Sequence, residues 1–435
     1  MPKLRAGAAR ACITPHIGCH ISGYFDDRIA VDILDDTFAK AIVLDNGDDA
    51  LAIVVLDLIA AHKEDLDRAK ARAEELTGIP AANIVISCTH THYGPAPVGL
   101  LDIPKEQAYM DWAMDRAADA VKRAQYRLQP CRIAHVSGQC PEETHNRRWV
   151  MKDGTVRMNP GFENPDMVRP AGPTDPEVAL LVIETPERAP IAALANYSLH
   201  YVGGDYHDRI SADYFGAFDR ALQRLAGSDF VAIMANGCCG DINNCDFARP
   251  APEYPYPFYQ AKRVANVVAS RAYGAWQQVR DFTDEAVLGS AVAEPPFTRR
   301  EPTDQQLADA EALLADPDAP HDMQYVYARE LFELLKQPVQ EPTRIHAMRI
   351  GDLGLVGLPG EIFVEYGLQI KAKSPATRTM TIELADDYVG YCPTDAALAE
   401  GGYETWLARS AKAAPGTETT MVTTAVGLLE GLFGG

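Results

Sequence analysis

The chain has 435 residues, and its 61 acidic side chains against 40 basic ones give a formal net charge of −21 at pH 7. This charge argues against nucleic acid and against an anionic membrane surface as partners, because both repel an acidic protein. The hydrophobic content of 47% is ordinary for a globular protein with a substantial core. No stretch approaches the ~20 apolar residues of a membrane span. We therefore expect a protein that acts on a small molecule; its oligomeric state stays open.

The cysteines and the N-terminus indicate the compartment. Nine cysteines are an odd number, and Cys238 is adjacent to Cys239, which does not suit a regular disulfide framework. The opening sequence MPKLRA has basic residues but no apolar run after them, so no signal peptide is expected. Both observations predict a reduced, cytoplasmic protein.

Strand-like apolar runs alternate with helical patterns along the chain. We expect strands at 50–56, 83–87, 178–183, 191–197, 230–234 and 353–358. The spacing of apolar residues predicts helices at 63–76, 105–124 and 259–279. This alternation predicts an α/β fold in which mixed β-sheets are flanked by helices.

The segments between these elements bear on domain organisation. They contain no internal repeat, low-complexity tract or Gly/Ser linker, so we expect one large domain over residues 1–435. Two helical patterns at 303–314 and 322–336 are separated by the turn-forming sequence DPDAP. They are expected to form a small helical hairpin, inserted into the domain at about 303–336.

The first candidate residues for chemistry follow the strand expected at 83–87. The chain has no G-x-S-x-G turn, no phosphate-binding GxxxxGK[ST] loop and no H-E-x-x-H helix. Instead, His90 and His92 come directly after that strand, in ISCTHTHYGP. If the strand continues to Tyr93, both imidazoles project from the same face, because residues two apart on a strand share a face.

Two further candidates follow later strands. His200 comes after the strand at 191–197, and Glu361 comes after the strand at 353–358, where it is expected to begin a helix. Zinc prefers histidine nitrogen and carboxylate oxygen, and a catalytic zinc keeps one position open for water. Spacing alone leaves other interpretations open, because single histidines are commonly structural and the helix dipole favours a carboxylate at a helix N-terminus.

A series of short motifs extends from about residue 6 to about residue 405. It begins with AGAARACITPHIGCHISGY and continues through ISCTHTHYGP, NRR (146–148), NYSLH and ISADYFGAF. It then includes ANGCCGDINN, LPGEIF and DDYVGYCPTDAALAEGGYE. In this order the motifs resemble the catalytic domain of the neutral (non-lysosomal) ceramidase family.

The resemblance implies a zinc-dependent hydrolase with one Zn²⁺ per chain. The implied ligands are His90, His200, Glu361 and Tyr391, the last being the second tyrosine of DYVGY. A zinc ion held in this way activates water to attack a carbonyl carbon. For Tyr391 the assignment comes from the resemblance alone.

The resemblance also implies roles around the zinc. His92 is expected beside the metal, as the general acid that protonates a leaving amine. Arg147 and Tyr403 are expected to donate hydrogen bonds to the carbonyl oxygen as charge develops on it. Three more residues are expected behind the ligands or beside the substrate: Asp241, Asn243 and His207. A plain turn is the alternative for the first of these, and a plain loop position for the last.

The sequence departs from the family in three respects. GDINN places Asn243 where the ceramidases carry a serine in GD-x-S-P. The C-terminal immunoglobulin-like domain of the ceramidases and an export signal are also not expected here. We therefore expect hydrolysis of an amide (C–N) bond in a small soluble substrate rather than in ceramide. Alternatives on the same site are an esterase or lactonase, a carbohydrate-directed hydrolase, a true ceramidase, and a relic that binds a ligand without turnover.

Overall fold

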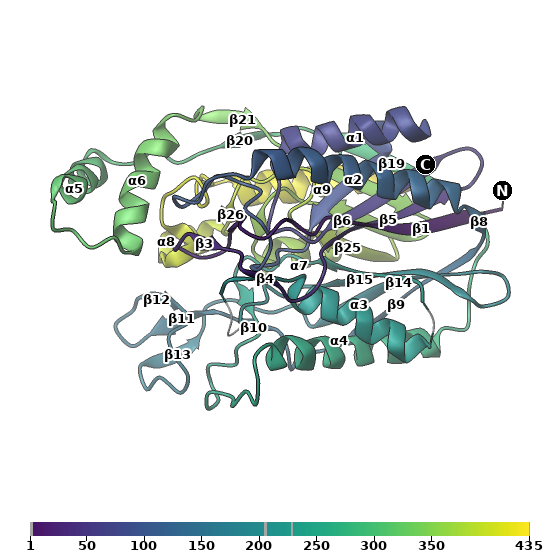
Figure 1. Ribbon diagram of the computed structural model, residues 1–435, viewed down its shortest axis with the longest axis horizontal. Coiled ribbons are helices and arrows are strands. Elements are labelled where there is room, and N and C mark those ends of the chain that lie inside the picture. The colour runs from purple at the N-terminus through teal and green to yellow at the C-terminus, as the bar shows by residue number, and fades with distance from the viewer. Residues whose placement is uncertain (1–2, 204–206, 228, 435) are drawn as a thin grey trace.

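The computed structural model describes residues 3–203, 207–227 and 229–434, and three β-sheets form its framework (Figure 1). The first sheet has the order β7-β6-β5-β1-β8 and contains β1 (Arg5–Cys12), β5 (Phe38–Asp45), β6 (Ala50–Leu56), β7 (Ile84–Cys88) and β8 (Gln129–Pro130). The second has the order β17-β15-β14-β9 and contains β9 (Arg132–Gln139), β14 (Glu177–Glu184), β15 (Pro190–Tyr197) and β17 (Val231–Asn236). The third has the order β19-β22-β23-β25 and contains β19 (Leu288–Ala293), β22 (Ile345–Ile350), β23 (Leu353–Gly357) and β25 (Arg378–Ile382).

All three sheets are mixed, with antiparallel pairs and a parallel pair at one edge. The parallel pairs are β6 with β7, β15 with β17, and β23 with β25. In α/β proteins, ligands gather where the carboxyl ends of parallel strands meet. The loops that follow these strands are therefore the places where functional side chains are expected to converge.

The first sheet is buried on both faces, and its strands alternate with a period of two. In β5, Ala41 and Val43 face the outer side, whereas Ile42 and Leu44 face the other two sheets. Burying a valine or leucine side chain stabilises the fold by about 1.5–3 kcal/mol. The outer face is covered by two helices, α1 (Lys63–Thr77) and α2 (Gln107–Tyr126).

The second sheet repeats this arrangement. Val178 and Leu180 of β14 face outward, and Ala179 and Leu181 face inward. The outer face is covered by two helices, α3 (Asp213–Ala226) and α4 (Tyr259–Gln278). The inner faces of all three sheets meet in one common core, so the layers run helix, sheet, sheet, helix from top to bottom in Figure 1.

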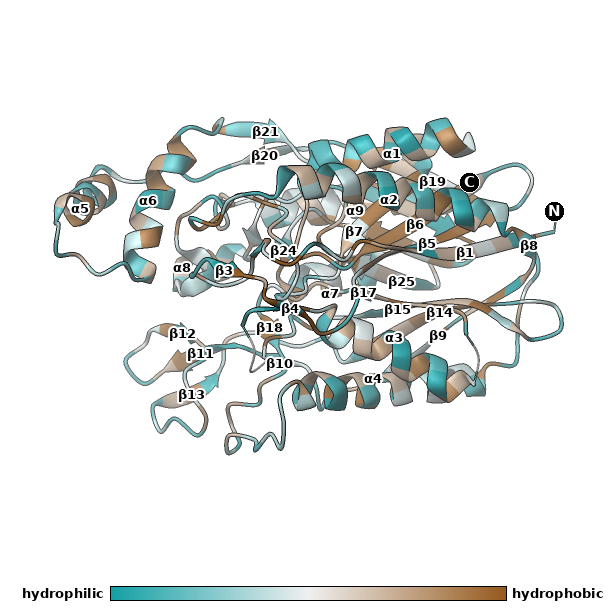
Figure 2. Cartoon of the chain, in the orientation of Figure 1, coloured by the Kyte–Doolittle hydropathy of each residue, from teal (hydrophilic) through white to brown (hydrophobic). Residues whose placement is uncertain are grey.

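The third sheet closes the side of this sandwich. Its other face packs against α7 (Val364–Lys373) and α9 (Thr417–Phe433). Figure 2 shows the consequence in colour, because β5 and β6 are brown along their length whereas α1 and α4 carry many teal residues. The predicted α/β fold with mixed sheets flanked by helices is confirmed.

Two helices form the predicted insertion, α5 (Asp304–Ala315) and α6 (Met323–Leu335). The Thr303 side chain accepts a hydrogen bond from the backbone of Gln306, whose side chain reaches back in a capping box. The side chain of Asp322 caps α6 in a similar way. Both helix starts are therefore encoded locally, and the expected boundaries are correct to within one residue. The pair projects at one end of the molecule, on the left in Figure 1.

Short elements connect and brace these layers. They are β2 (His20–Ile21), β3 (Arg28–Ile29), β4 (Asp32–Ile33), η1 (Ala81–Asn83), β10 (His145–Asn146), β11 (Arg148–Met151), β12 (Val156–Met158), β13 (Met167–Pro170), β16 (Arg209–Ile210), β18 (Ile242–Asn243), β20 (Pro296–Thr298), β21 (Gln340–Pro342), β24 (Glu361–Ile362), β26 (Tyr391–Cys392), α8 (Asp395–Glu400) and η2 (Tyr403–Thr405). Among the described residues, none of the helices combines the length and apolar character needed to cross a membrane.

At the strand ends one condition is not met and one expectation is wrong. β7 ends at Cys88 and does not continue to Tyr93, because its neighbour β6 also ends there and offers no further ladder. Glu361 does not begin a helix. Its backbone N–H donates to the carbonyl of Gly390 (3.0 Å), which holds it extended in the pair β24–β26. Helix α7 begins only at Val364.

Candidate metal centre

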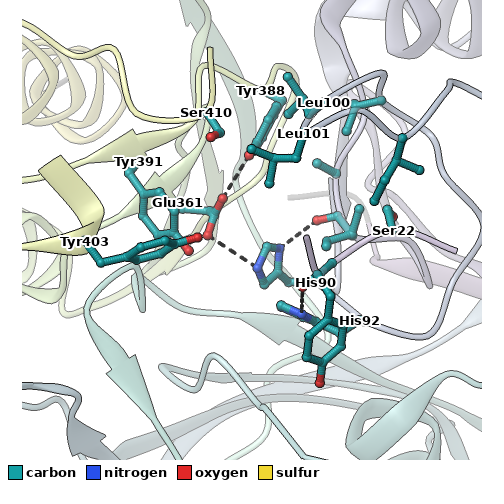
Figure 3. Close-up of a pocket in the computed structure, with 16 residues that line it drawn as sticks. Ser22, His90, His92, Leu100, Leu101, Glu361, Tyr388, Tyr391, Tyr403 and Ser410 are labelled. Carbon is teal, nitrogen blue, oxygen red and sulfur yellow. Dashed lines mark hydrogen bonds and ion pairs between the residues drawn. The ribbon is translucent and has the colours of Figure 1, made fainter. Parts of the chain in front are cut away.

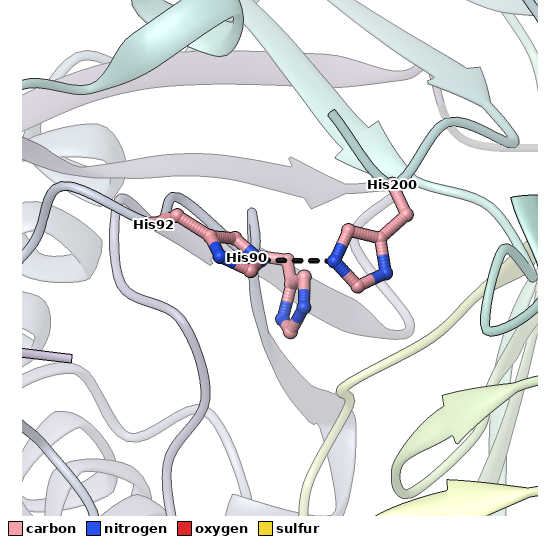
Figure 4. A group of neighbouring side chains, drawn as sticks. All are labelled: His90, His92 and His200. Carbon is pink, nitrogen blue, oxygen red and sulfur yellow. Dashed lines mark hydrogen bonds between the residues drawn. The ribbon is translucent and has the colours of Figure 1, made fainter. Parts of the chain in front are cut away.

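Three histidines converge at the carboxyl ends of β7 and β15 (Figure 4). His90 and His92 follow β7, and His200 follows β15; each is no more than 8% exposed. Their ring centroids lie 4.4–4.9 Å apart. Within the described part of the chain, one nitrogen from each ring lies within 4.8 Å of the others, a spacing that can hold a metal ion.

The backbone of His90 explains how both histidines of the pair reach the same site without a continuing strand. His90 has a φ of 72°, in the left-handed region, which costs a non-glycine residue about 1–3 kcal/mol and persists only where the surroundings enforce it. Its N–H donates to the carbonyl of Leu58 (2.9 Å), which holds the turn. His92 is held by Gly23, whose carbonyl accepts from Nδ1 at 2.9 Å. A Cβ at Gly23 would lie 2.8 Å from that nitrogen, so a glycine is required there.

Glu361 contributes the carboxylate of the site. Its Oε2 lies 3.4 Å from Nε2 of His90 and 3.9 Å from Nδ1 of His200. Neighbouring ligands of a tetrahedral zinc, with bonds of ~2.1 Å, are about 3.4 Å apart. The other oxygen, Oε1, accepts a hydrogen bond from the hydroxyl of Tyr388 at 2.9 Å. The distance from Glu361 to His90 equals this spacing, and the distance from Glu361 to His200 is somewhat longer.

The hydrogen bonding of this group fits a bound cation. His90 Nδ1 lies 2.8 Å from the carbonyl of Ile59, so it donates, and in the neutral ring Nε2 is left with a lone pair. Nε2 of His90 and Oε2 of Glu361 are both buried, and neither has a hydrogen-bond partner among the residues that the structure describes. Two acceptors that face each other away from water are costly unless a proton or a metal ion lies between them.

The pKa shifts of His90 and Glu361 also favour a positive charge between them. Burial lowers the pKa of His90, but the neighbouring Glu361 outweighs it, so the pKa of His90 is raised. Burial alone raises the pKa of Glu361, and His90 outweighs that effect and lowers the pKa. Each group thus stabilises the charged form of the other, so a positive charge between Nε2 and Oε2 is favoured, whether a proton or a metal ion carries it. The residues fit a divalent metal ion.

A chain of hydrogen bonds with one consistent direction lies beside this pair. The guanidinium nitrogen Nη1 of Arg147 donates to Nδ1 of His200 at 3.0 Å. The proton of His200 is therefore on Nε2. That nitrogen donates to Nε2 of His92 at 2.9 Å. Burial and the charge of His90 lower the pKa of His92 and of His200, so both rings are neutral. Since Nδ1 of His200 has one lone pair, a metal ion bound at that nitrogen would take the place of the hydrogen bond from Arg147.

Arg147 reaches the site from the short strand pair β10–β18. Its backbone N–H donates to the carbonyl of Asp241 (2.9 Å), and its Nε donates to Oε1 of Glu404 at 2.8 Å. The guanidinium lies 5.3 Å from the centre of the Tyr391 ring. Its other terminal nitrogen, Nη2, is buried, and no described residue accepts a hydrogen bond from it. A donor is therefore available on the side of the guanidinium that no protein group uses.

The predicted tyrosines lie on the same side of the site. Tyr391 is opposite Glu361 in the pair β24–β26, and both side chains line the same cavity. The Tyr403 ring lies 5.9 Å from the Tyr391 ring. Burial raises the pKa of Tyr403 to about 12, so its hydroxyl is a neutral donor. In Figure 3 both tyrosines, Glu361 and His90 surround one cavity.

This cavity has a volume of about 80 Å³. The polar side is formed by the candidate metal residues and their neighbours: His90, His92, Glu361, Tyr388, Tyr391 and Tyr403. The apolar side is formed by Ile59, Val98, Leu100, Leu101 and Ile103. A reacting group in the cavity contacts the metal residues on one side and hydrocarbon on the other.

Three predicted residues lie outside this group. Asp241 braces the scaffold, with Oδ1 accepting from the backbone of Val364 (2.9 Å) and Oδ2 from the side chain of Asn146 (2.7 Å); burial raises its pKa to about 6. Asn243 is buried and donates to Asn159 at 2.7 Å. His207 is exposed, with its ring 5.2 Å from that of Tyr24. A role at the substrate remains a prediction for these positions.

Similarity to known proteins points to one fold. No family model matches the chain. Over 242 residues the chain is 23% identical to the neutral ceramidase of Pseudomonas aeruginosa, a match that covers 53% of this chain and 34% of that protein. The match therefore spans about a third of the length of the curated relative.

Solved structures give a longer alignment. The crystal structure of the neutral ceramidase from Pseudomonas aeruginosa aligns with 100% of this chain and 75% of that chain, at a TM-score of 0.78 and 20% identity. The chain has the neutral ceramidase fold. A ceramidase complexed with C2 aligns with 99% of this chain and 75% of that chain, at a TM-score of 0.78 and 19% identity. The resemblance expected from the ordered motifs is thus confirmed at the level of the fold.

Within this neutral ceramidase fold, two residues of the site were not expected from the sequence. Tyr388 binds Glu361, and Glu404 binds Arg147 and is fully buried. Tyr388 lies three residues before Tyr391, in the same DDYVGY motif. This proximity is the sequence signal from which a role for Tyr388 at the site could have been predicted. Glu404 follows Tyr403, but nothing local distinguishes it from an exposed glutamate.

Proposed function

We propose that this protein is a zinc-dependent hydrolase that cleaves an amide (C–N) bond in a small soluble substrate. The observation that carries the proposal is the buried pair of acceptors, Nε2 of His90 and Oε2 of Glu361, 3.4 Å apart and without partners among the described residues. The zinc ligands would be His90, His200, Glu361 and Tyr391, with one ion per chain. Nitrogen and oxygen donors in this proportion suit zinc, which takes histidine and carboxylate ligands.

The chemistry that zinc supplies when bound is a lowering of the pKa of water from ~16 towards ~7 and polarisation of a carbonyl. Arg147 and Tyr403 then act on the carbonyl oxygen of the substrate. The Nη2 nitrogen of Arg147, which no described residue engages, and the neutral hydroxyl of Tyr403 are donors held in place before the reaction. Preorganised donors of this kind each contribute about 3 kcal/mol of transition-state stabilisation. Glu404 holds the guanidinium in the required orientation.

His92 moves the proton. Its Nδ1–H is fixed to the carbonyl of Gly23, so Nε2 is the atom that takes up and releases a proton, in exchange for the hydrogen bond that it accepts from His200. Because burial keeps the ring neutral, His92 can accept a proton when water attacks and deliver it to the leaving nitrogen. His92 and His200 are in contact (2.9 Å), so the proton moves at the edge of the metal residues.

The amide assignment is supported by the neutral ceramidase fold and by the name of the curated relative, since ceramide is an amide. The small cavity, of about 80 Å³, favours a small substrate over a long lipid. Esters and lactones would meet the same zinc, donors and base. They are therefore the alternative that a test has to separate from amides.

A substrate panel with a metal control tests the proposal. The protein is stripped with a chelator, reloaded with zinc, and assayed on matched amides, esters and lactones. We expect the protein to hydrolyse amides, to lose this activity on chelation and to regain it with zinc. The Glu361→Gln variant should have no amide hydrolysis. Glu187→Gln changes an exposed glutamate and is the matched control. Hydrolysis of esters or lactones alone would redirect the proposal to those bonds. Inertness of the zinc-loaded protein on all three classes would contradict a catalytic role.

A further inference from the structure

We propose that the α5–α6 insertion restricts the substrate to short acyl groups, and that Glu330 of α6 is the residue through which it acts. This inference rests on the proposed function. Glu330 is 1% exposed although it lies on the projecting insertion. A buried carboxylate that far from the sheets requires partners, and its partners belong to the loops around the cavity.

The Glu330 carboxylate joins three segments. Oε1 accepts from the backbone N–H of Leu101 at 2.9 Å. The guanidinium of Arg409 binds both oxygens, at 2.6 Å and 2.9 Å, and the backbone N–H of Arg409 adds a contact at 3.3 Å. Charge-assisted and bidentate bonds of this type are the strong ones. α6 is thereby fixed to the loop at 98–103 and to the segment that follows Tyr403.

The loop at 98–103 is held in a conformation that it does not favour by itself. Leu101 and Asp102 are consecutive non-glycine residues with φ of 54° and 66°. Such residues persist only where their surroundings enforce them, and they gather at ligand-binding sites. α6 supplies two restraints, because Glu330 holds Leu101 and Arg329 donates to Asp102 at 3.1 Å, in addition to the hydrogen bond that closes the turn between Ile103 and Leu100.

This loop forms the apolar side of the cavity. Leu101 lies with Leu100 around the same space as Glu361 and Tyr403 (Figure 3). α6 also touches the polar side, because the ring of Tyr327, one turn before Glu330, packs edge-on against the ring of Tyr403, with 6.4 Å between ring centres. One helix of the insertion therefore fixes the distance between the two sides of the cavity.

The volume of the cavity indicates the size of the acyl group that fits it. An engineered apolar cavity of about 150 Å³ holds benzene, so about 80 Å³ holds roughly three or four carbon atoms. The walls that would contact these atoms are leucine, isoleucine and valine side chains, which favour hydrocarbon over a polar group. The class of substrate is thus an amide with a short aliphatic acyl group, of acetyl to butyryl size.

Binding of alkyl hydroxamates to the zinc-treated protein tests this inference without requiring turnover. Acetyl, butyryl and octanoyl hydroxamates are titrated by calorimetry into the wild type, Glu330→Ala and Glu330→Gln. We expect the wild type to bind the two short compounds at least about tenfold more tightly than the octanoyl compound. In Glu330→Ala the released loop should remove that preference. Glu333→Gln, on the same helix but bonded to Lys336 near the surface, should retain it.

Two further readouts keep the outcome decisive. If Glu330→Ala does not fold, Leu101→Ala enlarges the same wall and should reproduce the lost preference. A wild type without a preference for short chains, or a folded Glu330→Ala that keeps it, overturns the inference. In parallel assays on N-acyl p-nitroanilides, a folded Glu330→Ala should show a KM about tenfold higher for the acetyl compound with kcat nearly unchanged. Failure of the proposed function is separate, because it appears as absence of amide hydrolysis at every chain length while the binding preference is still measured.

Discussion

Glu361 and Tyr391 lie directly opposite each other in a two-residue parallel strand pair, β24 with β26. The backbone N–H of Glu361 donates to the carbonyl of Gly390, which holds the two segments together. Two of the four proposed ligands are thus held by backbone pairing between distant segments. Such pairing orders a metal site before the metal arrives, because the ligands do not have to be immobilised by the ion.

Replacing Tyr391 by phenylalanine tests whether it is a ligand. Tyr391→Phe keeps the ring and the strand pair but removes the oxygen. We expect zinc affinity to fall by at least about tenfold, since even groups that only support metal ligands contribute 10- to 100-fold. Competition with a fluorescent chelator measures the affinity. Tyr126→Phe, at a residue that is 89% exposed, is the control. Equal affinities in both variants would remove Tyr391 from the ligand set.

Replacing Arg147 by lysine separates charge from geometry. Lysine keeps the positive charge but cannot donate to Glu404 and the substrate oxygen together. We expect kcat to fall by about 10²–10³, as when one preorganised donor is lost, while KM changes little. Steady-state kinetics on the best substrate measures this, with exposed Arg280→Lys as the control. A kcat within threefold of the wild type would contradict the donor role.

Asp386 stabilises the fold away from the cavity. It is fully buried, with Lys70 at 2.6 Å and His346 at 2.7 Å. Burial raises its pKa, but Lys70 and His346 outweigh that effect, so the pKa of Asp386 lies below its ordinary value. A depressed carboxyl pKa stabilises the folded state above the unfolded-state pKa of ~3.9, and this contribution is lost as the pH falls towards the folded-state pKa.

Asp386→Asn should therefore lower the free energy of unfolding at pH 7 by about 3–5 kcal/mol, the cost of breaking a buried ion pair. The difference from the wild type should narrow as the pH is lowered below ~4, where the wild-type carboxylate loses its advantage. Urea unfolding at a series of pH values measures both effects, with exposed Asp281→Asn as the control. A difference in unfolding free energy that grows towards low pH would contradict the lowered pKa of Asp386.

Ser290, His346 and Asp386 have the spacing of a serine-hydrolase triad but should not act as one. Ser290 Oγ lies 2.7 Å from His346 Nε2, and His346 Nδ1 lies 2.7 Å from Asp386. The hydroxyl also lies 2.6 Å from the carbonyl of Ala82, to which it donates, and Lys70 already neutralises Asp386. We expect Ser290→Ala to keep full activity and fluorophosphonates to leave Ser290 unmodified. Inactivation with label on Ser290 in mass spectra would instead place catalysis there.

The sequence predicts the main elements where local signals are strong. The continuous apolar runs of β6, β14 and β15 and the capped helices α5 and α6 were all expected, with boundaries close to those observed. β1, with the sequence RAGAARAC, was not expected, because alanine has little strand preference and the strand depends on its pairing with β5. α9 was not expected either, because its threonines and valines disfavour a helix that packing against the third sheet stabilises.

The candidate site could be predicted only in part for similar reasons. His90, His92, His200 and Glu361 follow strands, and ends of strands can be recognised in a sequence. The left-handed turn at His90 and the register of Glu361 against Tyr391 depend on contacts between distant segments, which spacing does not contain. Tyr391 was therefore found from the family resemblance alone.

The bond between Arg147 and Glu404 was not expected at all. Burial of a glutamate is decided by its partners, and here Arg147 and Arg148 both bind it from another part of the chain. Where charged residues are neutralised by partners from a distant part of the chain, none of them carries a local signal.

Metal content tests the central claim most directly. The wild type, His200→Ala and the control His16→Ala, which changes an exposed histidine, are purified, incubated with zinc, desalted and analysed by inductively coupled plasma mass spectrometry. Our account predicts about one zinc ion per chain in the wild type and in the control, as expected for a single catalytic site, and a sharp loss in His200→Ala. Absence of stoichiometric metal in the wild type, or an equal amount in His200→Ala, would contradict the metal centre and leave only the fold.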